Sequence, residues 1–302
     1  MFATARLQAL DAVATHRTVG RAAAALHLTP SAVSQQLTAL EREAGAPLTE
    51  RDGRGLRLTP AGRLLAGHAT EVLARLRLAR SQLDRRHDEV VGTVRVGAIP
   101  TSVHALAPAA MSRLRAAHPE LRVTLADGES PQTLPAVLAD DLDVAVVENW
   151  PGLPAPVPAG TARRELVADD VVDLALPAAH RLAGRRRVSL GEVDDVPWVV
   201  DRPDNRSHDW MLHVLRTAGV EPDVLATVCG WGMHLDLVAG TGVAALVPRL
   251  ARPAAPAGVV MVATDPVYTR SVDAVWRADR ESPAVRAVVD ALAAVGRERA
   301  RD

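Results

Sequence analysis

The segment from residue 22 to residue 58 constrains the fold of this chain most, because it contains a dense series of helix start and stop signals. Thr29 stands at the N-cap position of a helix, Pro30 at its first position, and Gly45 just after its last turn. A short Ala-rich helix precedes this one, and a hairpin follows it. The segment therefore predicts two helices joined by a turn and followed by two short strands.

The helix that begins at Pro30 has one apolar and one polar face. Its apolar residues recur at i, i+4 and i+7, which predicts that they pack into a core: Val33, Leu37 and Leu40. Short hydroxyl and amide side chains cover the opposite face, and such groups near a helix N-terminus suit phosphate oxygens and base edges of DNA. Our candidates for contacts with bases and the groove are Pro30, Ser31, Ser34, Gln35 and Thr38. Gln35 can pair with adenine through two hydrogen bonds, and the alternative is a solvated surface glutamine.

The hairpin supplies positive charge beside this helix. Arg51, Arg54 and Arg57 flank its glycine turn and would form a basic wing. Thr29, Arg51 and Arg54 are our candidates for phosphate contacts. The order of N-cap, polar helix face and Arg-flanked turn predicts a winged helix-turn-helix DNA-binding domain over residues 1–59. Because capped amphipathic helices occur in many helical domains, the alternative is a helical domain that does not bind DNA.

About 65 residues at the N-terminus resemble the DNA-binding domain of LysR-type transcriptional regulators, without a gap, through the sequence LQALDAVATHRTVGRAAAALHLTPSAVSQQLTALEREAGAPLTERDGRGLRLTPAG. Thr18, Val19 and Gly20 stand where the family has Ser-Phe-Thr, which removes a hydroxyl that could contact the DNA backbone. Thr49 stands where Phe is usual, which removes an aromatic residue from the core. The family's reading helix begins Ser-Gln-Pro; that Gln is missing here, so we expect a different base preference.

Residues 60–88 are predicted to form a long linker helix, because Thr59 and Pro60 repeat the pattern of N-cap and first helical position. At about 1.5 Å per residue the helix would span roughly 40 Å. Apolar residues on it follow the alternating spacing of 4 and 3 that is typical of a dimerisation seam: Leu65, Ala69, Val72, Leu76, Ala79 and Leu83. The alternative is an amphipathic helix that packs on its own domain, whereas the resemblance implies that the helix dimerises.

The charge is distributed unevenly along the 302 residues, although the net charge is only −1. Residues 1–87 carry 13 Arg against 7 acidic residues, and the remainder is acidic, which fits a basic DNA-contacting end on an acidic body. Cys229 is the only cysteine, which excludes an internal disulfide and a multi-cysteine zinc site. No signal segment or long uninterrupted apolar run is present, so we expect a cytoplasmic protein without a membrane partner.

Residues 89–302 alternate apolar strands with helices, which predicts an α/β domain with a mostly parallel sheet. We expect strands at residues 91–99, 121–126, 142–147, 171–176, 198–200, 223–228, 243–247, 259–263 and 271–277. We expect helices up to residue 118 and at 132–139, 209–218, 234–239 and 283–297, with a helical turn at 190–193 and an extended connection at 151–158.

The phrases LDVAVV, DLALPAAHRLA, VPWVV and LVAGTGVAALVP resemble the effector domain of the same family in order and spacing. This resemblance implies a two-lobed fold like that of periplasmic binding proteins. Lobe I would comprise residues 89–161 and 267–302, and lobe II residues 162–266. The predicted fold class is therefore α+β multidomain: a winged helix-turn-helix, a linker helix and a two-lobed α/β effector domain.

Small ligands of α/β folds bind beyond the carboxyl ends of the strands. This rule selects the effector-site candidates Pro100, Thr101, Ser102, Gly128, Glu129, Ser130, Glu148, Arg202, Asn205, Ser207, His208, Thr227 and Trp231. Thr101 and Ser102 at a helix start would offer hydroxyl and N–H donors to an anion, or simply cap the helix. Glu129 and Glu148 would instead favour a cation, or be solvated loop carboxylates. Trp231 would stack on the ligand or lie in the core.

We predict no enzymatic activity, because the chain has no G-x-S-x-G elbow and no GK[ST] phosphate loop. His208 and His213 lack partners at metal-ligand spacing, so we predict no metal and no cofactor. The alternative is a binding module or an enzyme on the periplasmic-binding-protein fold with an incidental helical N-terminal domain. The sequence favours a ligand-responsive regulator. Its expected partners are double-stranded promoter DNA, a small-molecule effector and further copies of itself in a homodimer or homotetramer, with RNA polymerase left open.

Overall fold

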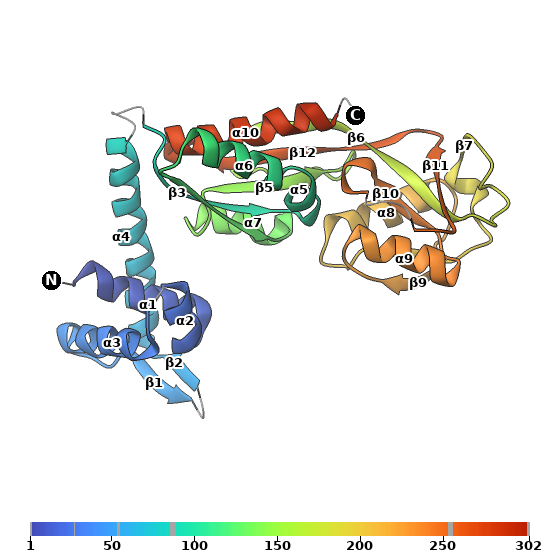
Figure 1. Ribbon diagram of the computed structural model, residues 1–302. Helices are drawn as coiled ribbons and strands as arrows, with labels where there is room; N and C mark the ends of the chain where they lie inside the picture. The colour runs from blue at the N-terminus through green and yellow to red at the C-terminus, as the bar shows by residue number, and fades with distance from the viewer. Residues whose placement is uncertain (1, 27, 53–54, 85–88, 253–255, 301–302) are drawn as a thin grey trace. The chain divides into compact units, whose positions relative to one another are not determined.

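The computed structural model describes all residues except 1, 27, 53–54, 85–88, 253–255 and 301–302. The chain divides into two compact units, residues 1–86 and residues 87–302. Figure 1 shows the elements of both units along the chain. None of the helices that the structure describes is long and apolar enough to cross a membrane.

The first unit is a winged helix-turn-helix with a long helix appended. Its elements are α1 (Thr4–His16), α2 (Val19–Ala25), α3 (Pro30–Ala44), β1 (Thr49–Asp52), β2 (Gly55–Leu58) and α4 (Pro60–Asp84). β1 and β2 form an antiparallel hairpin in which Thr49 faces Leu58. The predicted helix boundaries at Pro30 and Pro60 are confirmed, and Gly45 ends α3 in the left-handed conformation with φ of 65°.

The core of the first unit joins all four helices with the base of the wing. Leu10 of α1, Leu40 of α3 and Leu48 before the wing are fully buried, and Ala69 of α4 packs in the same cluster. Gly62 lets α4 approach the wing closely, since a Cβ there would overlap the carbonyl oxygen of Leu48. This packing fixes the start of α4 against the hairpin.

The second unit contains an eight-stranded mixed sheet with helices on both faces. Its strands are β3 (Gly92–Ala98), β4 (Leu121–Asp127), β5 (Val144–Asn149), β6 (Thr161–Pro177), β7 (Arg187–Val188), β8 (Trp198–Val200), β9 (Val224–Thr227), β10 (Ala245–Pro248), β11 (Val259–Thr264) and β12 (Tyr268–Arg277). Its helices are α5 (Pro100–Ala105), α6 (Ala107–Ala117), α7 (Ser130–Leu138), α8 (Arg206–Thr217), α9 (Trp231–Thr241) and α10 (Pro283–Arg299), with 3₁₀ turns η2 (Leu190–Glu192), η3 (Arg249–Ala251) and η4 (Ala278–Arg280).

The strand order in the large sheet is β4-β3-β5-β12-β6-β11-β7, with β10 also pairing with β6, while β8 and β9 form a separate parallel pair. β3 is parallel to β4 and β5, but β12 is antiparallel to β5 and β6. The expectation of a mostly parallel sheet is therefore wrong for the centre of the sheet. The cause is the return of the chain through β12, which pairs with β6 from Thr161 to Val172.

β6 is 17 residues long and extends well before the predicted start of its strand at residue 171. The first half of β6, TARRELVADD, was not predicted as a strand. It contains many charged residues, and only some of its side chains are buried. Its pairing comes from the backbone of β12, a long-range partner that the local sequence pattern does not reveal. β6 and β12 run through both lobes, as Figure 1 shows.

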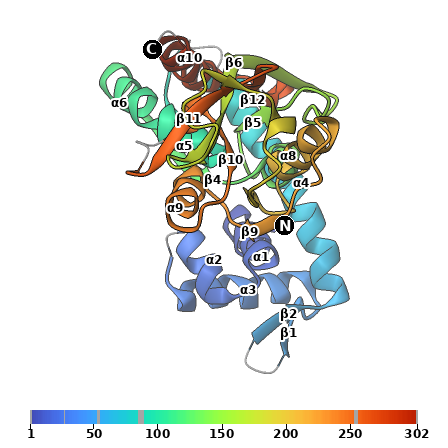
Figure 2. The same cartoon turned by 90° about the vertical axis from the view of Figure 1, so that its right-hand side faces the viewer.

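Each lobe has its own core on the shared strands. Leu166 and Val167 of β6 pack in the first lobe with α6 and α10, whereas Val172 and Leu174 pack in the second lobe with α8. The first lobe therefore extends beyond the expected boundary at residue 161. In the second lobe, α8 and α9 cover opposite faces of the strands, as Figure 2 shows. Trp150 stacks on Trp210 of α8 with ring centroids 4.1 Å apart.

Candidate DNA interface and effector cleft

The candidate DNA interface is the N-terminal half of α3. The Oγ1 of Thr29 accepts a hydrogen bond from the backbone N–H of Ala32 at 3.2 Å and lies 3.0 Å from the hydroxyl of Ser31. The N-cap that the sequence predicts is therefore formed, and the first turn of α3 is held in place by short side chains.

The polar face of α3 is exposed along its length. The hydroxyl of Ser34 donates to the carbonyl oxygen of Pro30 at 3.0 Å, which leaves its oxygen free to accept. Pro30, Ser31, Ser34, Gln35 and Thr38 are all exposed, and the buried residues of α3 are Val33, Leu37 and Leu40. The structure thus brings the five base-contact candidates onto one open surface.

The wing is anchored to α3 by a single carboxylate. Oε1 of Glu41 accepts hydrogen bonds from the N–H of Leu48, the N–H of Thr49 and the hydroxyl of Thr49 at 2.9–3.0 Å. Thr49 therefore holds the wing base by hydrogen bonds where the family usually has an aromatic residue. The side chain of Arg51 and all of Arg54 lie outside the described residues, and the exposed Arg57 forms an ion pair with Glu50 at 2.8 Å.

The six seam candidates on α4 fall into two groups. Leu65 is half-buried and Ala69 is fully buried in the core of their own unit, so Ala69 presents no surface to a partner. Val72 and Leu76 are 45% and 49% exposed, and Ala79 is exposed as well. The side chain of Leu83 is not among those described. Among the seam candidates, the exposed apolar surface is therefore that of Val72, Leu76 and Ala79.

The candidate effector cleft lies between the two lobes of the second unit. A cavity of about 20 Å³ is lined there by seven of the thirteen predicted residues: Pro100, Thr101, Glu129, Glu148, Asn205, Ser207 and Trp231. Counted with its solvent-open part, the same cavity encloses about 260 Å³ of space between atoms. In this conformation the inner cavity holds little more than one water-sized group.

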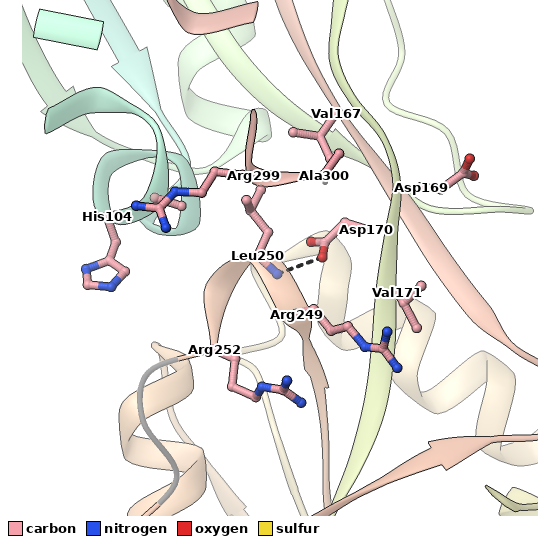
Figure 3. A pocket seen from close by; sticks show the side chains of 11 residues that line it. His104, Val167, Asp169, Asp170, Val171, Arg249, Leu250, Arg252, Arg299 and Ala300 are labelled. Carbon is pink, nitrogen blue, oxygen red and sulfur yellow. Dashed lines mark hydrogen bonds between the residues drawn. The ribbon is translucent and has the colours of Figure 1, made fainter. Parts of the chain in front are cut away.

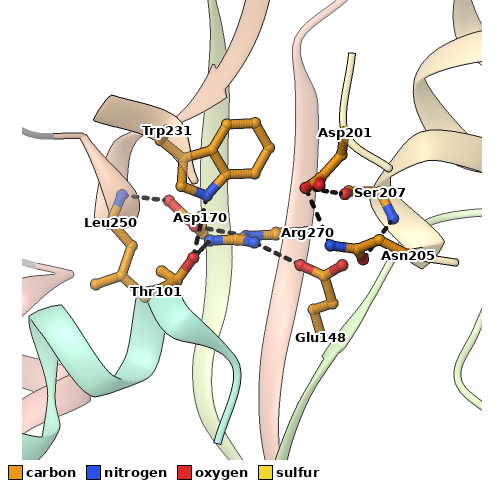
Figure 4. Close-up of polar contacts among 9 residues, drawn as sticks. All are labelled: Thr101, Glu148, Asp170, Asp201, Asn205, Ser207, Trp231, Leu250 and Arg270. Atoms are coloured by element: carbon orange, nitrogen blue, oxygen red, sulfur yellow. Dashed lines mark hydrogen bonds and ion pairs between the residues drawn. The ribbon is translucent and has the colours of Figure 1, made fainter. Parts of the chain in front are cut away.

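Arg270 of β12 is the centre of the polar network in this cleft. Its Nε donates to Asp170 at 2.9 Å, Nη1 to Glu148 at 2.6 Å, and Nη2 to the hydroxyl of Thr101 at 3.2 Å. The side chain is fully buried, and its guanidinium lies 5.3 Å from the ring centroid of Trp150. Figure 4 shows Arg270 between the carboxylates of Glu148 and Asp170.

One hydrogen bond joins the two lobes directly across the cleft. The indole N–H of Trp231, at the start of α9, donates to the Oγ1 of Thr101 in α5 at 3.2 Å. This oxygen thus accepts from both Trp231 and Arg270. The N–H of Ser102 is used by the carbonyl oxygen of Ile99 at 2.9 Å, so it is not the free anion donor that we expected.

Asp201 dominates the wall formed by the second lobe. Its Oδ2 accepts from the amide of Asn205 at 3.0 Å and from the hydroxyl of Ser207 at 2.8 Å, and its Oδ1 accepts from the N–H of Arg202 at 2.8 Å. Nδ1 of His208 lies 2.7 Å from the carbonyl oxygen of Asp201 and fixes the same loop. Asn205 and Ser207 are therefore oriented by Asp201.

Two groups in the cleft have raised pKa values. Burial raises the pKa of Glu129 to about 8, and the nearby carboxylates of Glu148 and Asp201 add to the effect. Arg270 acts in the opposite direction. Burial also raises the pKa of the Cys229 thiol, which disfavours the reactive thiolate.

The other six predicted residues do not line the inner cavity. Ser102 and Ser130 are buried, Gly128 packs near Thr133, Arg202 forms an exposed ion pair with Asp204, His208 supports Asp201, and Thr227 is exposed at the end of β9.

The sequence reasoning missed two important residues, Asp201 and Arg270. Asp201 directly follows the apolar strand β8, so the rule that selected Glu129 could have found it. Arg270 shares the alternating register of the buried residues Val272 and Ala274 in β12, which was a signal for a buried cation.

A second, larger cavity of about 400 Å³ is lined by residues of α5, β6, η3 and the end of α10 (Figure 3). Arg249, Arg252 and Arg299 line it, but Arg249 and Arg252 both form ion pairs with the buried carboxylate of Asp173 at 2.8–2.9 Å. Asp170 and Asp169 add negative charge to its wall. The positive charge of this cavity is therefore largely neutralised within the protein.

Comparisons with known proteins give the same two-unit division. A family model described as the LysR substrate binding domain matches residues 87–297, and one described as bacterial regulatory helix-turn-helix protein, lysR family, matches residues 4–63. The chain is 29% identical over 274 residues to the transcriptional regulator IlvY of Escherichia coli, which is 90% of this chain and 87% of that protein. It is 31% identical over 250 residues to a probable hydrogen peroxide-inducible genes activator of Mycobacterium avium, at 82% and 78% coverage.

Solved structures share the fold over nearly the whole chain. Full-length OxyR from Pseudomonas aeruginosa has a TM-score of 0.70 and 21% identity, and the match covers 98% of this chain and 95% of that one. Full-length CbnR in a complex with its target DNA has a TM-score of 0.64 and 19% identity, with 97% and 99% coverage.

Proposed function

This chain belongs to the LysR family of bacterial transcriptional regulators, and we propose that its α3 reads promoter DNA while the cleft of its second unit binds the controlling effector. It is a DNA-binding regulator with an effector-binding domain, and not an enzyme. The proposal concerns which residues perform each task. Binding promoter DNA also implies that the protein acts in the cytoplasm.

The observation that supports the DNA role is the exposed polar face at the capped N-terminus of α3. Because Gln35 and Thr38 lie on this face and point away from the core, they can reach base edges in the major groove. We assign phosphate contacts to Thr29, Arg51 and Arg54, and such contacts position α3 without reading sequence.

Exposed apolar residues of α4 support self-association. Val72, Leu76 and Ala79 leave an apolar strip that two copies of the chain can bury against each other. A dimer of this kind would present two reading helices to paired half-sites. We therefore propose a homodimer through α4 as the smallest DNA-binding form. The proposal also includes a tetramer and a contact with RNA polymerase, and it rests for both on the sequence resemblance alone.

We propose that the effector acts by shifting the population of lobe arrangements. The cavity has room for about one water-sized group, and Trp231 bonds to Thr101 across it, so a larger ligand requires the lobes to separate or to shift. A ligand that binds one arrangement better than another changes the balance between them. In the oligomer this change would alter the spacing of the reading helices on DNA.

The names of the relatives do not define the effector of this chain. A thiol switch based on an internal disulfide is excluded, since Cys229 is the only cysteine. The effector class must therefore be inferred from the cleft itself.

The DNA assignment is tested by comparing two variants on a panel of single-base substitutions in the bound duplex. Gln35→Ala should lower discrimination at one base position by about 1–3 kcal/mol and leave the other positions unchanged. Arg54→Ala should weaken binding to all duplexes alike and reduce the salt slope by about one unit. Equal losses of both kinds in both variants would contradict this division between base and phosphate contacts.

A further inference from the structure

One buried carboxylate oxygen in the cleft lacks a hydrogen-bond donor among the described residues. It is Oε1 of Glu148, a residue with only 3% of its surface exposed. The other oxygen, Oε2, is held by Nη1 of Arg270 at 2.6 Å. Figure 4 shows the carboxyl group of Glu148 facing Asn205 on the opposite wall of the cavity. Because a buried carboxylate oxygen without a donor is costly, a donor from outside the chain would stabilise this position.

The lining of the cavity is acidic. Its eleven described residues include the carboxyl groups of Glu129, Glu148 and Asp201 and no Arg, Lys or His. Behind the lining, the guanidinium of Arg270 is already shared between Glu148 and Asp170. A concave site with this charge attracts a cation and repels an anion.

The volume of the inner cavity limits the size of the cationic group that can enter it. About 20 Å³ accommodates one water-sized group, which matches a primary ammonium but not the larger planar guanidinium. An ammonium offers three donors and no acceptor, which suits a wall of carboxylate oxygens. A metal ion fits less well, because the described residues contain no group of three or more His, Cys, Asp or Glu side chains placed to hold one.

We propose that the cleft binds a small organic primary amine in its ammonium form, with the ammonium donating to Oε1 of Glu148. Glu148 and Asp201 supply the negative charge that faces the ammonium, Glu129 can release its proton when the cation binds, and the rest of the amine extends toward the solvent-open side of the cavity. This inference names the effector class and therefore rests on the proposed effector role of the cleft. Burial, together with repulsion from Glu148 and Asp201, raises the pKa of Glu129, and a bound cation would lower this pKa again.

The position of Glu148 connects this ligand to the contact between the lobes. Arg270 donates to Glu148 and to Thr101, and Thr101 accepts from Trp231 of the second lobe. An ammonium at Glu148 competes with Arg270 for the same carboxylate. The ligand thus acts on Glu148, which is linked to the Thr101–Trp231 bond through Arg270.

The inference is tested by calorimetric titration of the full chain with three five-carbon compounds whose terminal groups are cationic, neutral or anionic: 1,5-diaminopentane, 1,5-pentanediol and glutarate. The diamine should bind at least about tenfold more tightly than the diol and the dianion, since a hydrogen bond to a charged group adds roughly 1.5–3 kcal/mol, or about 10- to 100-fold in affinity. The methylated bis-trimethylammonium analogue keeps the charge but has no N–H donor, so it should bind more weakly than the diamine.

Variants connect binding to the named residues. Glu148→Gln should lower the affinity for the diamine by roughly 10- to 100-fold. Because Glu148 also pairs with Arg270, a second variant, Glu129→Gln, removes a lining carboxyl without touching that pair. Above pH 8, where Glu129 is ionised, this variant should weaken binding several-fold. Asp127→Asn is the matched control: it removes an exposed carboxylate at the end of β4 and should leave the affinity unchanged.

Three outcomes would overturn the inference: the diol or glutarate binding better than the diamine, no binding of the diamine at millimolar concentration, or binding that is indifferent to both Glu148→Gln and Glu129→Gln. None of them contradicts the regulator function, which is judged separately by DNA binding of the same preparation. Conversely, diamine binding that requires Glu148 in a protein without preference for its native duplex would support the inference and contradict the proposed function.

Discussion

Replacing Arg270 by Met tests whether the buried hydrogen-bond network of Arg270 in the cleft stabilises the second unit. Arg270 is fully buried, and its guanidinium donates to Asp170, Glu148 and Thr101. Met keeps an unbranched, flexible stem of similar length but removes all three donors. The substitution leaves two buried carboxylates without their cation.

The expected cost is about 3–5 kcal/mol in the free energy of unfolding, the range found when one partner of a buried ion pair is removed. This is a large part of the 5–15 kcal/mol that typically stabilises a domain. Arg249→Met is the matched control. Arg249 is about half exposed and shares Asp173 with Arg252, so its loss should cost about 1 kcal/mol or less.

Tryptophan fluorescence during urea unfolding reports on the second unit alone, because all five Trp residues lie there: Trp150, Trp198, Trp210, Trp231 and Trp276. Arg270→Met should shift the midpoint to clearly lower urea, whereas Arg249→Met should stay near the wild type. If Arg270→Met unfolds at the wild-type midpoint, or if the two variants lose equal stability, the network does not have the role that we assign to it.

Three further predictions follow from the packing and charges. Leu76→Asp should shift sedimentation toward the monomer, because it places a charge in the exposed apolar strip of α4. Leu64 is exposed outside that strip, so Leu64→Asp should leave the profile unchanged. Equal profiles of the two variants would refute the α4 dimer. Gly296→Ala should cost about 1–3 kcal/mol of stability because its Cβ would overlap a carbonyl oxygen of β6, whereas Gly240→Ala on α9 has open space and should not destabilise. The pKa of Glu129 is raised from 4.5 to about 8, so the folded state keeps a proton that the unfolded state releases, and stability falls as the pH rises through this window. Glu129→Gln should therefore gain stability relative to the wild type from pH 4.5 to about 8, and a constant difference would contradict the shifted pKa.

Local signals were sufficient for the first unit. Thr29, Pro30 and Gly45 act through neighbouring residues, and each end of α3 lies where these residues place it. The seam on α4 shows the limit of such signals. Heptad spacing identifies which residues share a stripe, but Ala69 is covered by its own unit, and only the tertiary contacts reveal this.

The second unit depends more on distant partners. The first half of β6 is charged and becomes a strand because β12 pairs with it from about a hundred residues away. In the same way, the rule for strand ends brought Thr101, Glu129 and Glu148 to the cleft, but the pairing of Glu148 with Arg270 depends on the register between β5 and β12. The chemical character of the site is therefore set by contacts that no local pattern contains.

The most direct test of the regulator is a titration of the purified full chain against the DNA upstream of its own gene and against a scrambled duplex, at several salt concentrations. We predict tight binding that prefers the native duplex and weakens as salt rises, because specific contacts from α3 add to phosphate contacts from the wing. Weak binding that is equal on both duplexes at every salt concentration would contradict the assignment of α3 as a reading helix for that DNA.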